Sequence, residues 1–232
     1  MKVWGVDGCP SGWFAVSSQG DLCLAPDFEA LLQVADSGRL YVDVPIGLPD
    51  VERRLESLVR RHQSVRAGSL FSVPCRQAVY ASSYQSACDI NLAVTGKKLS
   101  KQSWFLCRKI REVDGVLRQQ SHARRRVMES HPELAFGVLN RSVLKTSKKT
   151  RAGIEERLAI LGRARPDARE LFISAENSFP RRQLGRDDIV DAMVLMLVGL
   201  GRKQRLVVPS QNRDAHGIPI RMIVPQIGRA HV

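Results

Sequence analysis

The chain has 232 residues, of which 44% are hydrophobic, and its formal net charge is +13 at pH 7. This length fits one substantial core better than two full domains, and the composition suits a globular protein. No apolar run is long enough to cross a bilayer, and the first residues pass into a strand pattern without the features of a signal peptide. We therefore expect a single domain over residues 1–232, a cytoplasmic location and no membrane partner.

The cysteines and the basic residues point away from disulfides and toward a polyanion. The five cysteines are scattered without a Cys-x-x-Cys pair, which indicates neither a disulfide framework nor a zinc site. The basic residues come in clusters, among them Arg53-Arg54, Arg60-Arg61 and Arg124 to Arg126. Such surfaces bind phosphates through the release of counterions, so we expect a nucleic-acid partner, DNA or RNA. The alternative is that the charge serves solubility alone.

The first part of the chain has the pattern of a mixed α/β fold. Residues 3–7 and about 13–17 are apolar runs separated by a turn-rich linker, which predicts a hairpin. A third short strand is expected at 22–24. The apolar spacing over 28–35 then predicts a helix, with Asp27 as its candidate N-cap.

Residues 40–44 return as a strand after this helix. A strand that follows such a crossover is expected to lie parallel to the first one. Asp7 lies at the end of the first strand and Asp43 at the end of the second. Ligands bind outside the carboxyl ends of strands in these sheets, so both acids are expected at one binding edge.

The rest of the chain is expected to be mostly helical, with a few further strands. The segment at about 62–122 is expected to be a helical insertion. The other predicted elements are helices at 50–61, 84–94, 102–117, 135–144, 153–161 and 188–200, a strand holding Glu129, and strands at 206–208 and 218–224 that pair with each other.

The last of these helices carries two acids on one face. Asp188 and Asp191 are three residues apart, so their side chains are neighbours on the helix surface. Asp191 has apolar residues on both sides, where an unpaired charge is costly, and this indicates a functional role. The adjacent Asp187 fits an ordinary N-cap.

The remaining acids have structural explanations that stay open at the level of the sequence. Asp7 can begin a turn, and Asp43 can simply end its strand. Glu129 and His131 lie on one side of an extended strand, where Glu129 can position a metal or water and His131 can be either functional or a structural hydrogen-bonding residue. Glu133 can favour the N-terminus of the next helix.

A cluster of acids without cysteines or a set of histidines favours Mg²⁺ or Mn²⁺, because these ions prefer oxygen ligands. Two such ions about 4 Å apart can activate a water and stabilise the leaving oxygen of a phosphodiester. A basic rim would hold the substrate strand around this acidic centre.

Seven short motifs, in this order along nearly the whole chain, resemble the ribonuclease H-like (RuvC and integrase-like) superfamily. The similarity is closest to one branch, domain of unknown function 429 (DUF429), described as predicted nucleases. The motifs are Gly5 to Trp13, Asp43 to Pro49, Ser72 to Arg76, Thr95 to Gln102, Lys109 to Asp114, Glu129 to Phe136 and Asp187 to Ala192.

The resemblance implies a mixed five-stranded α/β sheet flanked by helices, and a nuclease whose metal-binding, catalytic acids are Asp7, Asp43, Glu129, Asp188 and Asp191. It also places a group of candidate substrate-binding residues near the site, namely Lys97, Lys101, Lys109, Arg76 and His131. Two alternatives remain: a nucleic-acid-binding protein without catalysis, and a nucleotide phosphohydrolase or phosphotransferase. The arginine-rich segment after Pro49 departs from the expected pattern, so the substrate preference is not carried over.

Overall fold

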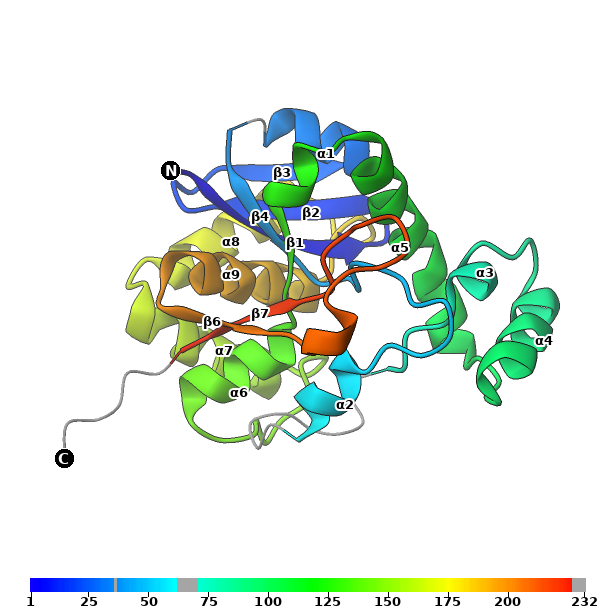
Figure 1. Ribbon diagram of the computed structural model, residues 1–232. Helices are drawn as coiled ribbons and strands as arrows, with labels where there is room; N and C mark the ends of the chain where they lie inside the picture. The colour runs from blue at the N-terminus through cyan, green and yellow to red at the C-terminus, as the bar shows by residue number, and fades with distance from the viewer. Residues whose placement is uncertain (36, 62–70, 227–232) are drawn as a thin grey trace.

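In the described part of the chain, the centre of the fold is one mixed sheet of seven strands in the order β3-β2-β1-β4-β5-β7-β6 (Figure 1). The computed structural model describes residues 1–35, 37–61 and 71–226. The strands are β1 (Val3–Cys9), β2 (Gly12–Ser17), β3 (Leu22–Ala25), β4 (Arg39–Val42), β5 (Val127–Glu129), β6 (Lys203–Leu206) and β7 (Met222–Pro225). The expectation of five strands is wrong, because the two C-terminal segments, besides pairing with each other, join the sheet through β7 beside β5.

The strand directions confirm the mixed pattern predicted from the first part of the chain. β1, β2 and β3 form an antiparallel meander, and β4 returns parallel to β1 after the intervening helix. β5 and β7 continue the parallel set, and β6 is antiparallel to β7. The carboxyl ends of the four central strands therefore meet at one edge.

One face of the sheet is covered by α1 (Phe28–Val34) and α5 (Lys101–Gln119). Alternate residues such as Trp4 and Val6 of β1 pack against them. Asp27 caps α1 as predicted, because its carboxylate accepts a hydrogen bond of 2.8 Å from the backbone N–H of Ala30.

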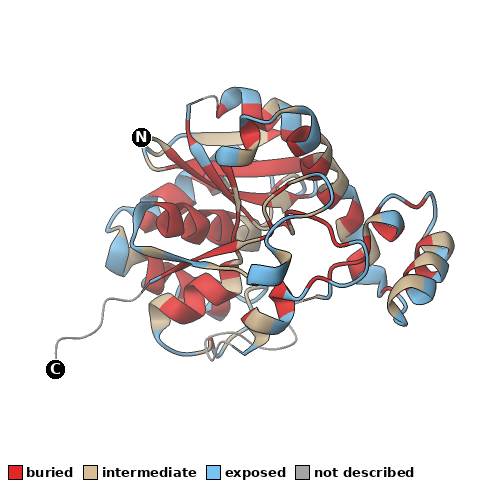
Figure 2. Cartoon of the chain, in the orientation of Figure 1, coloured by how far each residue is buried: buried red, intermediate tan, exposed pale blue. Residues whose placement is uncertain are grey.

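The opposite face is covered by the C-terminal helices, with α9 (Arg186–Leu200) against β1 and β4. Every residue of α9 from Ile189 to Gly199 is buried (Figure 2), as the apolar composition of the helix predicts. The helices α6 (Pro132–Asn140), α7 (Arg151–Ala164) and α8 (Ala168–Ser178) pack around it. The helix α8 is not among the elements predicted from the sequence.

The connection between β4 and β5 carries the expected helical insertion. It contains α2 (Leu55–Arg60), α3 (Arg76–Val79), α4 (Tyr84–Thr95) and α5, and in Figure 1 α3 and α4 stand out at the far right of the molecule. Part of the expected insertion, residues 62–70, lies outside the described residues. Short 3₁₀ turns occupy Ala123–Arg125 and Pro209–Gln211. Among the described helices, none combines the length and apolar character required to span a membrane.

Candidate functional site

Two of the predicted acids meet at the carboxyl edge of the parallel strands. The backbone N–H of Asp43 donates to the carbonyl of Val6 at 3.1 Å, which continues the β1–β4 register so that Asp7 and Asp43 are neighbours. Side chains alternate along a strand, so Asp7 shares a face with Val3 and Gly5. This is the face that α9 covers.

Gly5 allows α9 to approach this face closely. A Cβ at position 5 would lie 1.9 Å from the carbonyl oxygen of Ala192 and 2.3 Å from the backbone nitrogen of Met196, so only glycine fits. The contact is made one residue after Asp191. The close packing of α9 on β1 therefore brings the first turns of the helix, with Asp188 and Asp191, to the end of the strand that carries Asp7.

The four aspartates form one electrostatic group, which we call the aspartate cluster: Asp7, Asp43, Asp188 and Asp191. Burial raises the pKa of Asp7 well above its usual range, and the charges of the other three add to this rise. Burial also raises the pKa of Asp191 to about 7 and that of Asp188 to about 6. The pKa of Asp43 is raised by burial as well. Acids held together in this way gain from a nearby cation.

Lys148 supplies a cation to the cluster. It lies in the loop between α6 and α7, and its Nζ forms an ion pair with Oδ2 of the fully buried Asp191. Burial acts to lower the pKa of Lys148, but the charges of Asp191, Asp7 and Asp43 raise it overall. Oδ1 of Asp191 is buried and has no hydrogen-bond partner among the described residues. The sequence does not predict this role, for which its signal is limited to the basic loop from Lys145 to Arg151.

A cavity of about 450 Å³ opens beside the cluster. Asp43, Asp191 and Lys148 line it together with His131 and Glu133. Another wall comes from the insertion and includes the apolar side chains of Val73, Pro74, Leu106 and Ile110 and the carboxylate of Glu56. The cavity therefore combines charged and apolar groups, and it has the size of a small-molecule site.

Glu129 does not join the aspartate cluster. It pairs with Val42 in the β4–β5 register, one residue before Asp43, so its side chain leaves the strand on the other face. There Arg53 contacts both of its carboxylate oxygens, with 2.9 Å between Nη1 and Oε2, and also pairs with the buried Glu56. The predicted metal ligand is thus the centre of a buried ion-pair network that also binds the backbone of Ile46.

His131 and Glu133 line the cavity but also have structural partners. Nδ1 of His131 accepts a hydrogen bond of 3.2 Å from the backbone N–H of Leu134 and so caps α6. Glu133 forms an ion pair with Arg157, which is almost fully buried. The structural hydrogen bond that the sequence left open for His131 is thus present at one of its ring nitrogens, Nδ1.

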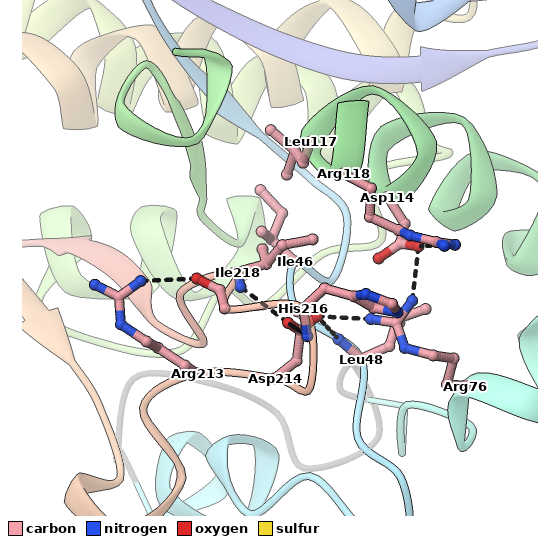
Figure 3. A network of polar contacts seen from close by, with 12 residues as sticks. Ile46, Leu48, Arg76, Asp114, Leu117, Arg118, Arg213, Asp214, His216 and Ile218 are labelled. Atoms are coloured by element: carbon pink, nitrogen blue, oxygen red, sulfur yellow. Dashed lines mark hydrogen bonds and ion pairs between the residues drawn. The ribbon is translucent and has the colours of Figure 1, made fainter. Parts of the chain in front are cut away.

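Arg76, predicted to bind substrate, belongs to a different network (Figure 3). Its guanidinium pairs with Asp114 of α5 at 2.8 Å and with Asp214 at 2.6 Å. Asp214 also accepts backbone hydrogen bonds from Leu48, His216 and Ile218. The network joins the insertion to the loop before β7, so Arg76 has a structural role here.

The predicted lysines lie at different distances from the acids. Lys97 pairs with Glu52 on the surface, and Lys101 is exposed at the start of α5. Lys109 is closest: it lies over the ring of Trp13 at 4.6 Å, and its charge acts on Asp7 and Asp188. Of the described residues that line the cavity, none is one of these lysines.

Comparison with protein families gives one match. The family model described as Protein of unknown function (DUF429) matches residues 5–213. The chain belongs to the DUF429 family. Comparisons with curated proteins and with solved structures found no match. The matched part of this DUF429 chain includes the whole aspartate cluster and Lys148.

The donor chemistry of this DUF429 site fits an oxygen-preferring divalent ion. Mg²⁺ often binds one or two carboxylates and completes its shell with waters and substrate phosphates. Asp191 offers a buried oxygen that no described residue hydrogen-bonds, and the mutual repulsion of the cluster is relieved by positive charge. Within the described part of the chain, no three His, Cys, Asp or Glu side chains are arranged to hold a metal ion together. A metal here would thus depend on two protein carboxylates and on other ligands.

Proposed function

We propose that the protein is a metal-dependent nuclease that hydrolyses phosphodiester bonds in nucleic acid. The observation that carries this proposal is the convergence of Asp7, Asp43 and Asp191 from two neighbouring parallel strands and the central helix. Acids from these three sources, at the carboxyl edge of a sheet, match the arrangement that the resemblance to the ribonuclease H-like superfamily implies. We also propose that the protein has the ribonuclease H-like fold.

In this proposal a Mg²⁺ or Mn²⁺ ion is held by two of the carboxylates of Asp7, Asp43 and Asp191 and completes its shell with waters and the substrate phosphate, with Asp188 at the margin of the site. The bound metal would supply a polarised water and charge stabilisation at the phosphate. Glu129 is left out of the ligand set, because both of its oxygens are engaged by Arg53. Lys148 is placed to orient Asp191 and to interact with a phosphate that enters the cavity.

The charge distribution supports a nucleic-acid substrate. The chain carries a formal net charge of +13, although its candidate site is acidic. A basic surface attracts the phosphate backbone, while the acidic centre needs a metal before it can accept a phosphate.

The experiment is cleavage of labelled single-stranded, duplex and branched DNA and RNA in Mg²⁺ or Mn²⁺. Asp7→Asn and Asp191→Asn are compared with wild type, and Asp89→Asn, an exposed carboxylate on α4, is the matched control. We expect cleavage that requires metal, survives in the control and falls by a factor of at least about 10² in both site variants. Equal cleavage by folded wild type, Asp7→Asn and Asp191→Asn would refute the proposal.

The cavity favours one second candidate, a nucleotide phosphohydrolase. Its volume of about 450 Å³ and its apolar lining residues suit a ligand of nucleotide size. The same protein preparations distinguish the two functions, because a phosphohydrolase would release phosphate from nucleoside triphosphates, in a reaction that needs Asp7 and Asp191, and would leave oligonucleotides intact.

A further inference from the structure

A second cavity, of about 560 Å³, lies next to the aspartate cluster, and its lining is mostly basic. It is formed where the N-terminal ends of α7 and α9 meet. Its charged lining residues are Lys148, Lys149, Arg151, Arg181, Arg186 and Asp187. We call it the basic cavity.

The basic lining residues are not all neutralised by the protein. Lys148 is paired with Asp191, whereas Arg186 and, more loosely, Arg181 approach Glu176. Within the described part of the chain, the side chains of Lys149 and Arg151 form no ion pair. Asp187 is the single carboxylate among the described lining residues, so a positive charge remains to be matched by a ligand.

The two helix ends reinforce this charge. α7 begins at Arg151 after the cap residue Thr150, and α9 begins at Arg186 after Gly185. Each N-terminus carries partial positive charge from the helix dipole and backbone N–H groups, which favours anions. The end of α9 is partly offset by Asp188, whose carboxylate accepts from the N–H of Gly185 at 3.0 Å.

Lys148 lines both the basic cavity and the cavity beside the acids. Lys149 lines both as well, so the two spaces are neighbours that share two side chains. A phosphate at the aspartate cluster has the basic cavity directly beside it, and a chain of linked phosphates can occupy both.

We propose that the basic cavity binds the sugar–phosphate backbone of the nucleic-acid strand, next to the bond that is cleaved. This inference rests on the proposed nuclease function, since the acids define where the reacting phosphate lies. The chemical group that the basic cavity recognises is phosphate. A nucleic-acid strand differs from free phosphate in its length, because a strand reaches from one cavity into the other.

The test is the salt dependence of binding in EDTA, with a fluorescent single-stranded 12-nucleotide DNA or RNA as the probe. Lys149→Gln/Arg151→Gln removes the two unpaired cations. Arg163→Gln/Arg202→Gln is the matched control, because it removes the same charge from exposed positions at the opposite ends of α7 and α9. Circular dichroism verifies that both variants are folded.

Each phosphate contact to a single strand contributes about 0.7 to the slope of log affinity against log salt. We expect the slope of Lys149→Gln/Arg151→Gln to be shallower than wild type by roughly 1 to 1.5, and that of the control to be unchanged. Equal slopes in the two double variants would overturn the inference, as would a wild type without salt-sensitive binding. Displacement of the probe by inorganic phosphate at equal phosphate concentration and constant ionic strength would also overturn it, in favour of a free-phosphate site.

The result of this binding test can be distinguished from the result of the cleavage test of the proposed function. Binding that depends on Lys149 and Arg151, without cleavage in Mg²⁺ or Mn²⁺, would uphold strand binding in the basic cavity and refute the nuclease. Cleavage with an unchanged salt slope would refute only the inference.

Discussion

The ammonium group of Lys148 contacts a carboxylate that solvent does not reach, that of Asp191. The lysine comes from the loop before α7, and the aspartate lies one turn into α9, so the pair joins two helices at the carboxyl edge of the sheet. Asp7 and Asp43 add negative charge around the same ammonium. In the metal-free protein, Lys148 thus supplies the positive charge that these acids require.

Replacing Lys148 by methionine is therefore expected to destabilise the metal-free protein. Removal of one partner of a buried ion pair costs several kcal/mol, and we expect about 1–3 kcal/mol here because Lys148 is partly accessible to solvent. The measurement is urea unfolding at pH 8 in EDTA. Lys149→Met, in the same loop but exposed, should change the free energy of unfolding by less than about 0.5 kcal/mol. Equal stability of the two variants would contradict this role of Lys148.

The raised pKa of Asp191 predicts a pH-dependent stability. Burial raises this pKa from 3.8 to about 7, so between these values the folded protein binds more protons at this site than the unfolded chain does. Stability contributed by this group is therefore lost as the pH rises from about 4 to 7. We expect Asp191→Asn to remove this loss, so that the stability of the variant relative to wild type increases from pH 5 to pH 8 in EDTA. A difference that is constant or falls with pH would contradict the assignment.

Arg53 and Glu129 give a prediction that separates a structural carboxylate from a metal ligand. Their side chains are 1% and 3% exposed, so a double-mutant cycle of Arg53→Met and Glu129→Gln should give a coupling energy of about 1–3 kcal/mol in urea unfolding. The control cycle uses Lys97→Met and Glu52→Gln, a pair that is 64% and 58% exposed. Exposed pairs typically contribute less than about 1 kcal/mol. A coupling energy no larger than that of the control pair, together with loss of Mg²⁺ binding in Glu129→Gln, would show that Glu129 is a metal ligand.

The placement of Glu129 also marks the limit of what the sequence could predict. The ends of β1 and β4 and the start of α9 are visible as apolar runs that finish or begin with an acid, so the meeting of Asp7, Asp43 and Asp191 could be expected. The face on which Glu129 leaves β5 depends on its pairing with Val42, and a shift of one residue reverses that face. The apolar pattern of a short strand does not fix this register.

The sequence likewise could not predict the long-range ion pairs. Asp214 lies far along the chain from Arg76, and the basic loop from Lys145 to Arg151 gives no sign that Lys148, rather than its neighbours, turns inward. Such contacts arise only when helices and loops from distant parts of the chain are packed. The missing prediction of α8 has a different cause, because its apolar residues Ala168, Leu171, Phe172 and Ala175 have the spacing of one helix face and could have predicted this helix.

Gly5 offers the most direct test of how the aspartate cluster is assembled. Gly5→Ala places a methyl group 1.9 Å from the carbonyl oxygen of Ala192, and this is backbone that moves only if α9 moves away from β1. We expect a loss of at least about 3 kcal/mol in urea unfolding, beyond ordinary overpacking. Gly115→Ala in α5 is the control, because its Cβ would meet nothing within 4 Å, and there we expect a gain of about 0.5–1 kcal/mol. If both variants had wild-type stability, the close packing of β1 and α9 would be disproved, and with it the proximity of Asp191 to Asp7.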